Sequence, residues 1–110
     1  MFDTSNNTNL FEIFVPAKFN DGKKIPIEHH EAFDKKVCDI VGGLTLQPAI
    51  FGKYQNAEKT FSDKIIPVRI ACTHANIMAV AIIAAEHYDQ ESIYYWKVSD
   101  FVEIYKREPL

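Results

Sequence analysis

The hydrophobic pattern switches between strand-like and helix-like segments in an order that few folds accommodate. Apolar residues recur at helical spacing in one segment, about 28–41, and they fill most of a second predicted helix, about 74–87. Shorter segments have the pattern of strands, and they cover about residues 10–19, 44–54, 64–72 and 92–98. The resulting order is βαββαβ, with a hairpin between the two middle strands. It predicts an α+β, ferredoxin-like fold in which a four-stranded antiparallel sheet carries two helices on one face; a different βαβ arrangement is the alternative.

Both predicted helices have recognisable ends. Gly42 and Gly43 are expected to end the first helix, because glycine adopts the left-handed capping conformation freely. Thr73 is expected to cap the start of the second helix. The first helix has a stripe of apolar residues that predicts its buried side, namely Ala32, Phe33, Val37, Ile40 and Val41.

Prolines fall within the predicted strands. Pro48, together with Gly52, is expected to interrupt the second strand. Pro16 and Pro67 lie on the two strands that this topology makes central, where a missing N–H group is costly. We therefore expect bulges or strand ends at Pro16 and Pro67.

The predicted sheet is apolar on both faces. In the last strand Tyr94, Trp96 and Val98 point one way, and Ile93 and Tyr95 point the other. An antiparallel sheet with helices on one side normally has a polar opposite face. Because one small domain cannot cover both faces, the pattern indicates that another subunit covers the second one. The alternative for the equally apolar second helix is deep burial within the monomer.

Length and composition narrow the class of protein. The 110 residues predict one domain at 10–110, preceded by a polar, flexible leader at 1–9 without the pattern of a signal peptide. A net charge of −3 provides no cationic field for nucleic acid. No apolar run reaches membrane-spanning length. Cys38 and Cys72 fit no metal or redox spacing, which indicates two buried thiols in a reducing, cytoplasmic protein.

The chain contains few candidates for catalysis. His29 and His30 are adjacent, so on a helix they point about 100° apart and cannot chelate one metal together. A polar contact at the start of the helix is the expected role of one of them, and neither a metal nor a cofactor is predicted. There is no nucleophile motif such as GxSxG and no phosphate-binding glycine loop.

The remaining candidates are polar residues at strand ends. Tyr54 lies near the end of the second predicted strand, Asp63 just before the third, and Gln90 and Glu91 just before the fourth. Neighbouring strands of a hairpin bring Tyr54 and Asp63 close enough to meet. The alternative is that all four are solvated residues at the rim of the sheet.

From about residue 10 to 99 the chain resembles the phage-type S-adenosylmethionine lyases, long called hydrolases. It also resembles their relatives that cleave the S-adenosylmethionine–AMP conjugate, a signal of some CRISPR antiviral systems. The resemblance rests on an ordered series of segments, which comprises the first strand, the helix opening with His29-His30, Gly43, GKY at 52–54, KIIPVRIAC at 64–72, the alanine-rich helix, and YDQESIYYWKVS at 88–99.

The resemblance implies a ferredoxin-like homotrimer, with a dimer as the alternative, that binds its small-molecule substrate between subunits. It implies that Tyr54 and Asp63 are catalytic. Glu58 is the alternative acid, because the family tends to have Glu at the position of Asp63 and a one-residue gap leaves the alignment ambiguous. It implies that Gln90 and Glu91 bind the substrate. It does not separate S-adenosylmethionine from its AMP conjugate, or a phage origin from a cellular one.

The chemistry of such a lyase demands little from the protein. The sulfonium of S-adenosylmethionine already activates the γ-carbon, so the substrate's own carboxylate can displace 5′-methylthioadenosine and form homoserine lactone. The enzyme holds the reactive conformer and stabilises the changing charge. Two other functions stay open at this point: a non-catalytic oligomer that sequesters a small nucleotide ligand, and a structural oligomer without a ligand.

Overall fold

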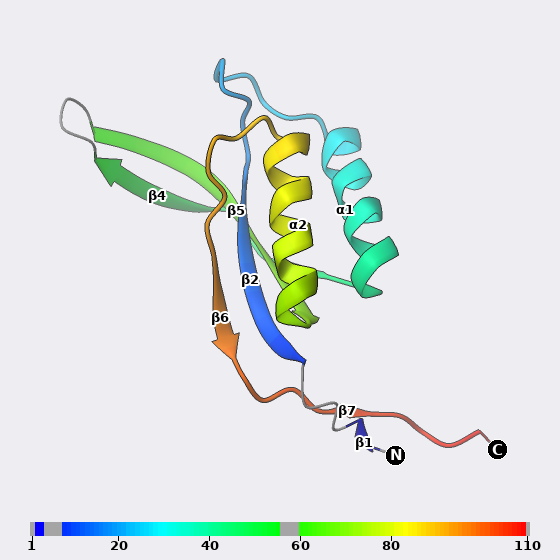
Figure 1. Ribbon diagram of the computed structural model, residues 1–110. Helices are drawn as coiled ribbons and strands as arrows, with labels where there is room; N and C mark the ends of the chain where they lie inside the picture. Colours follow the sequence, from blue (N-terminus) through cyan, green and yellow to red (C-terminus); the bar gives the residue numbers. More distant parts are fainter. Residues whose placement is uncertain (1, 4–7, 56–59, 110) are drawn as a thin grey trace.

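A computed structural model describes residues 2–3, 8–55 and 60–109. Its order of elements confirms the predicted βαββαβ plan, with a short extra strand at each end of the chain (Figure 1). The elements are β1 (Phe2–Asp3), β2 (Asn9–Pro16), α1 (Ile27–Val41), β3 (Thr45–Leu46), β4 (Ile50–Gln55), β5 (Thr60–Cys72), α2 (His74–His87), β6 (Tyr95–Ser99) and β7 (Ile104–Tyr105).

The main sheet is antiparallel, and its strands follow the order β3-β5-β2-β6, with β4 also paired to β5. Strands β3 and β4 lie along the same edge of β5 and form one strand that breaks at Pro48, as predicted. Gly52 does not interrupt β4, because it pairs directly with Asp63. Both helices lie on one face of the sheet, whereas the β4–β5 hairpin extends away from them (Figure 1).

The hydrophobic core fills the space between the helices and the sheet. Its fully buried side chains include Ile13 from β2, Phe33 from α1, and Ile77 and Val80 from α2. The predicted stripe of α1 is only partly buried, since Ala32 and Ile40 are exposed. Helix α1 packs chiefly against α2, so a narrower strip of its surface is covered than the hydrophobic pattern indicates. Neither described helix is long and apolar enough to cross a membrane.

The two prolines of the central strands behave differently. Pro16 is the last residue of β2, as expected. Pro67 lies inside β5, in continuous register opposite Phe14, so the expected bulge or strand end is wrong there. The carbonyl of Pro67 accepts a hydrogen bond from the Gln47 N–H at 3.1 Å, which directs the nitrogen of Pro67 toward the same edge. That edge faces the break between β3 and β4, so the missing N–H removes no bond to β2.

Helix and strand ends agree with the sequence to different degrees. Helix α2 has the predicted bounds, with Thr73 as its N-cap, and Gly42 caps α1 at a φ of 87°. Strand β5 begins at Thr60, four residues before the predicted start, because residues 60–63 also pair with β4. Strand β6 begins at Tyr95 rather than Ser92, because the chain turns through Asp89, which has a φ of 49°.

The ends of the chain lie together. Strand β7 pairs with β1 in an antiparallel two-stranded sheet, which places Tyr105 opposite Phe2. Residues 4–7 of the predicted leader lie outside the described residues, so the division into a leader and a domain stays a prediction.

Candidate active site

The sheet face opposite the helices carries exposed aromatic side chains. Phe14, Tyr94 and Trp96 form one cluster, with ring centroids 5.7–6.1 Å apart. Tyr94 and Trp96 keep 60% and 50% of their surface exposed. The predicted alternation of β6 is therefore correct, and the helix-free face is apolar at its centre.

A buried carboxylate, which the sequence analysis missed, lies beside this aromatic cluster. Glu12 is only 6% exposed and lies opposite Arg69 on β5 and Trp96 on β6. One carboxylate oxygen accepts hydrogen bonds from Gln47 at 2.7 Å and Arg69 at 2.9 Å, and the other accepts one from the Trp96 indole at 3.2 Å. Burial raises the pKa of Glu12, but these donors outweigh it and lower the pKa below its usual value. This carboxylate therefore fixes Trp96 and joins neighbouring strands.

The two predicted catalytic residues lie on the β4–β5 hairpin. The pairing puts Tyr54 opposite Phe61 and Asp63 opposite Gly52, so the two residues occupy neighbouring positions on the same face of the hairpin. Asp63 is exposed. The side chain of Tyr54 and the whole of Glu58 lie outside the part of the chain that the structure describes.

The two predicted binding residues follow α2. The Gln90 N–H donates to the Ala85 carbonyl at 2.9 Å, which anchors this turn to the last turn of α2. The side-chain Nε2 of Gln90 donates to the Tyr88 carbonyl at 3.0 Å and to the Asn20 Oδ1 at 2.9 Å. Asn20 in turn donates from its Nδ2 to the Asp89 carbonyl at 2.9 Å. Asn20, which sequence reasoning missed, therefore holds both the backbone and the side chain of this turn.

These contacts determine the orientation of the Gln90 side-chain amide, that is, which end is the nitrogen and which is the oxygen. Backbone carbonyls only accept hydrogen bonds, so they identify the nitrogen of each side-chain amide at this turn. The nitrogen of Gln90 is used inside the protein, whereas its Oε1 has no hydrogen-bond partner among the described residues. The Glu91 carboxylate beside it is exposed. Gln90 and Glu91 therefore both offer acceptors, which suits a ligand group that donates hydrogen bonds, such as an ammonium.

The segment after β2 contacts both the strand that carries Asp63 and the turn that carries Gln90. The Ala17 N–H donates to the Lys64 carbonyl at 3.1 Å, next to Asp63. Asn20, which holds Gln90, follows three residues later, and three extended residues span about 10 Å. Asp63 and Gln90 are thus anchored to the same end of the sheet. No described contact joins the hairpin pair directly to Gln90 or Glu91.

The adjacent histidines form a clasp between the start of α1 and the end of α2. The His29 and His87 rings stack with centroids 4.0 Å apart. Nε2 of His29 lies 2.9 Å from the His87 carbonyl, and Nε2 of His87 lies 2.7 Å from the His29 carbonyl. His30 Nδ1 lies 2.7 Å from the buried Tyr88 hydroxyl. Both adjacent histidines thus make the polar contact that was expected of one of them. The described residues contain no cluster of metal-ligating side chains.

The hydrogen bonds of the clasp select neutral His87. Its Nε2 must donate to a carbonyl, and its Nδ1, 3.1 Å from the Lys36 ammonium, must accept. Burial lowers the pKa of His87, and the neighbouring His29 and Lys36 add to that effect, against the carbonyl contact and Asp34. Burial also lowers the pKa of His30, with His29 and His87 adding to it. The folded protein therefore disfavours protonation of both histidines.

This clasp predicts a stability that falls with mild acid. An unfolded histidine has a pKa of about 6.5, and the folded values lie lower, so the unfolded state binds more protons as the pH falls through that range. We expect a lower Tm at pH 5.5 than at pH 7.5, and a smaller difference in His87→Gln, because glutamine retains an N–H donor but does not titrate. Calorimetry of the parent and of His87→Gln at both pH values measures the Tm difference. Glu12 titrates below this window, so an equal drop in His87→Gln would show that His87 is not responsible.

The cysteines are free thiols in different surroundings. Cys72 is buried, which raises its pKa to about 11 and keeps its thiol protonated. Cys38 is exposed on α1, so the expected burial of both thiols is wrong.

Comparison with solved structures shows what this fold is similar to. A phage S-adenosylmethionine lyase in complex with S-methyl-5′-thioadenosine matches 89% of this chain and 85% of its own, with a TM-score of 0.67 and 15% identity. CutA1 from Oryza sativa matches 92% of this chain and 83% of its own, with a TM-score of 0.61 and 12% identity. A CutA1 from the bacterium Shewanella sp. SIB1 matches 84% and 80%, with a TM-score of 0.63 and 10% identity. No protein-family model and no curated protein sequence matches the chain.

Proposed function

We propose that this protein is a lyase that cleaves S-adenosylmethionine, or its AMP conjugate, to 5′-methylthioadenosine, or its AMP-linked form, and homoserine lactone. The observation that carries the proposal is the shared fold with a phage S-adenosylmethionine lyase over 89% of this chain. A fold alone does not specify a reaction, so the polar groups at one end of the sheet supply the second support. The AMP conjugate connects the protein with antiviral signalling of the CRISPR type.

The proposed reaction needs no cofactor. The substrate carboxylate attacks its γ-carbon, the C–S bond breaks, and the electron pair returns to the sulfonium, which becomes the neutral thioether of methylthioadenosine. In the proposed site Tyr54 and Asp63 act near the reacting atoms. Gln90 and Glu91 hold the substrate ammonium, consistent with the free acceptor of Gln90 and the exposed carboxylate of Glu91. The work of the protein is to orient a folded substrate.

We place this site between the subunits of a homotrimer in the cytoplasm. Two features favour a second subunit at the site. The β4–β5 hairpin, which carries Tyr54 and Asp63, extends away from the rest of the domain (Figure 1). The neighbouring sheet face exposes Tyr94, Trp96 and Val98, which a monomer leaves in water at a cost in free energy.

A non-catalytic, ligand-sequestering oligomer is the second candidate, because the CutA1 proteins share the fold, as the phage lyase does. The experiment that separates the two is incubation of the purified protein with either compound, followed by mass spectrometry. Release of methylthioadenosine identifies a lyase. Recovery of the intact compound bound to the protein identifies a sequestering protein and contradicts the proposal.

A further inference from the structure

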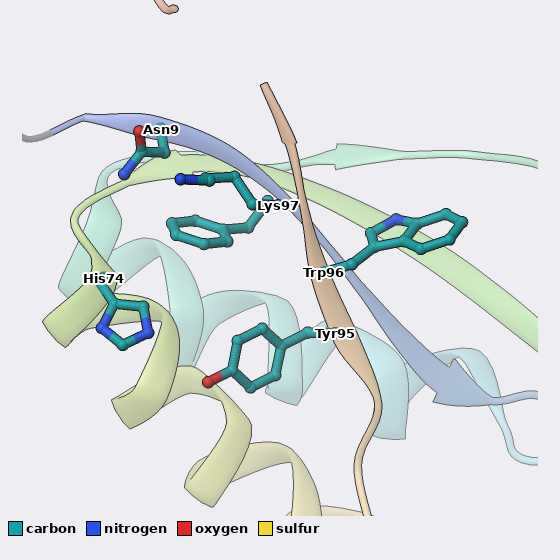
Figure 2. A pocket seen from close by; sticks show the side chains of 6 residues that line it. Asn9, His74, Tyr95, Trp96 and Lys97 are labelled. Carbon is teal, nitrogen blue, oxygen red and sulfur yellow. The ribbon is translucent and has the colours of Figure 1, made fainter. Parts of the chain in front are cut away.

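A cleft lies at the opposite end of α2 from Gln90 and Glu91. Its volume is about 330 Å³, and Asn9, Phe11, His74, Tyr95, Trp96 and Lys97 line it. It opens between the start of α2 and the edge strand β6 (Figure 2). Because 14 residues of helix span about 20 Å, this cleft is separate from the turn that carries Gln90. Its size falls in the usual range of small-molecule sites.

The cleft has an aromatic wall. The Phe11 ring is 3% exposed, and its centroid lies 6.2 Å from the His74 ring and 6.4 Å from the Tyr95 ring. Tyr95 points from β6 toward α2, whereas Trp96 points to the other side of the strand (Figure 2). A planar ring of a ligand can therefore pack between Tyr95 and His74, over the edge of the core.

The polar groups of the cleft are cationic or neutral, without a carboxylate. Lys97 extends its ammonium toward Asn9, on the same side of β6 as Tyr95 and His74 (Figure 2). Among the described residues, neither Lys97 nor the His74 side chain has a hydrogen bond or ion pair. An ammonium that shares its cleft with no carboxylate attracts an anionic ligand group.

We propose that this cleft binds a small phosphate monoester with an aromatic ring, such as a nucleoside monophosphate. The ring packs against Tyr95 and His74, and the phosphate accepts hydrogen bonds from Lys97 and Asn9. This site is independent of the proposed lyase site, and it does not require the protein to be an enzyme.

The test uses AMP as the probe and adenosine and inorganic phosphate as partial probes. Nuclear magnetic resonance titration of the isotope-labelled protein at pH 7.5 maps the binding residues. We expect AMP to shift the signals of His74, Tyr95 and Lys97. Adenosine and inorganic phosphate are each expected to bind at least tenfold more weakly, because each lacks one of the two recognised groups.

A matched pair of variants locates the charge. Lys97→Gln is expected to weaken AMP binding about tenfold or more, the effect of losing one charge-assisted hydrogen bond. Lys24→Gln removes the same charge from an exposed position that bridges to Lys18, and this variant is expected to bind AMP like the parent. The proposal is overturned if AMP shifts only the signals of Gln90 and Glu91, if it does not bind, or if both lysine variants bind it equally.

Discussion

Tyr54→Phe is expected to lower kcat by about 100-fold or more, with the oligomer unchanged. If the tyrosine hydroxyl stabilises charge that develops as the C–S bond breaks, its loss resembles the removal of one preorganised hydrogen-bond donor from an active site, which costs about 100- to 1,000-fold. Phenylalanine keeps the ring, so little packing energy is lost. The measurement is the steady-state rate of methylthioadenosine formation by the parent and the variant.

Two controls separate a chemical role of Tyr54 from a structural one. Tyr94→Phe removes a hydroxyl from the helix-free face of the sheet, where Tyr94 makes only ring contacts among its described side-chain interactions. It is expected to keep the parent kcat. Light scattering should give both variants a mass near three protomers of 12.6 kDa. If Tyr54→Phe keeps the parent kcat, Tyr54 contributes only packing, and its assignment as a catalytic residue is wrong.

The second large effect is expected at Glu91. Glu91→Gln keeps the size and polarity of the side chain but removes its charge. A charge-assisted hydrogen bond contributes about 1.5–3 kcal/mol, so the Kd should rise about tenfold to a hundredfold. Calorimetry with S-adenosylhomocysteine measures this effect without turnover, because that ligand has the ammonium but no sulfonium to cleave.

The neighbouring carboxylate provides the matched control. Asp89 is exposed, and asparagine tolerates its left-handed conformation. Asp89→Asn therefore removes the same charge two residues away and should leave the Kd unchanged. Gln90 is a poor neutral control, because its amide nitrogen holds the turn through Asn20 and Tyr88. If Glu91→Gln and the parent have equal Kd values, Glu91 does not bind the ligand and is a solvated residue. If Glu91→Gln has a sharply lowered Tm, Glu91 has a structural role instead.

The elements that depend on local sequence were predictable. Helix α2 has the expected bounds because Thr73 caps its start and its apolar residues run without a break from Ile77 to Ala85, close to its end. The hairpin and the two-sided sheet also follow from local patterns. The start of β6 was wrong by three residues, because the strand-like composition of Ser92 to Tyr94 does not reveal that the turn from Asp89 keeps most of these residues out of the ladder.

The features that were missed depend on contacts between distant segments. Glu12 looks like a surface residue in a strand, but Gln47, Arg69 and Trp96 converge on it across the sheet. Its position on the helix-free face of a central strand was the one available signal. Asn20 lies in a plain turn sequence, and its role follows from a contact with Gln90 seventy residues away. Local propensity carries no information about such pairs.

In the proposed reaction the substrate's own carboxylate, rather than water, displaces methylthioadenosine. The most direct test is a reaction of the purified protein with S-adenosylmethionine or its AMP conjugate in ¹⁸O-labelled water, followed by mass spectrometry at early times. We expect methylthioadenosine, or its AMP-linked form, together with homoserine lactone that contains no ¹⁸O. Absence of both products, or homoserine with ¹⁸O in its γ-hydroxyl group, would contradict it.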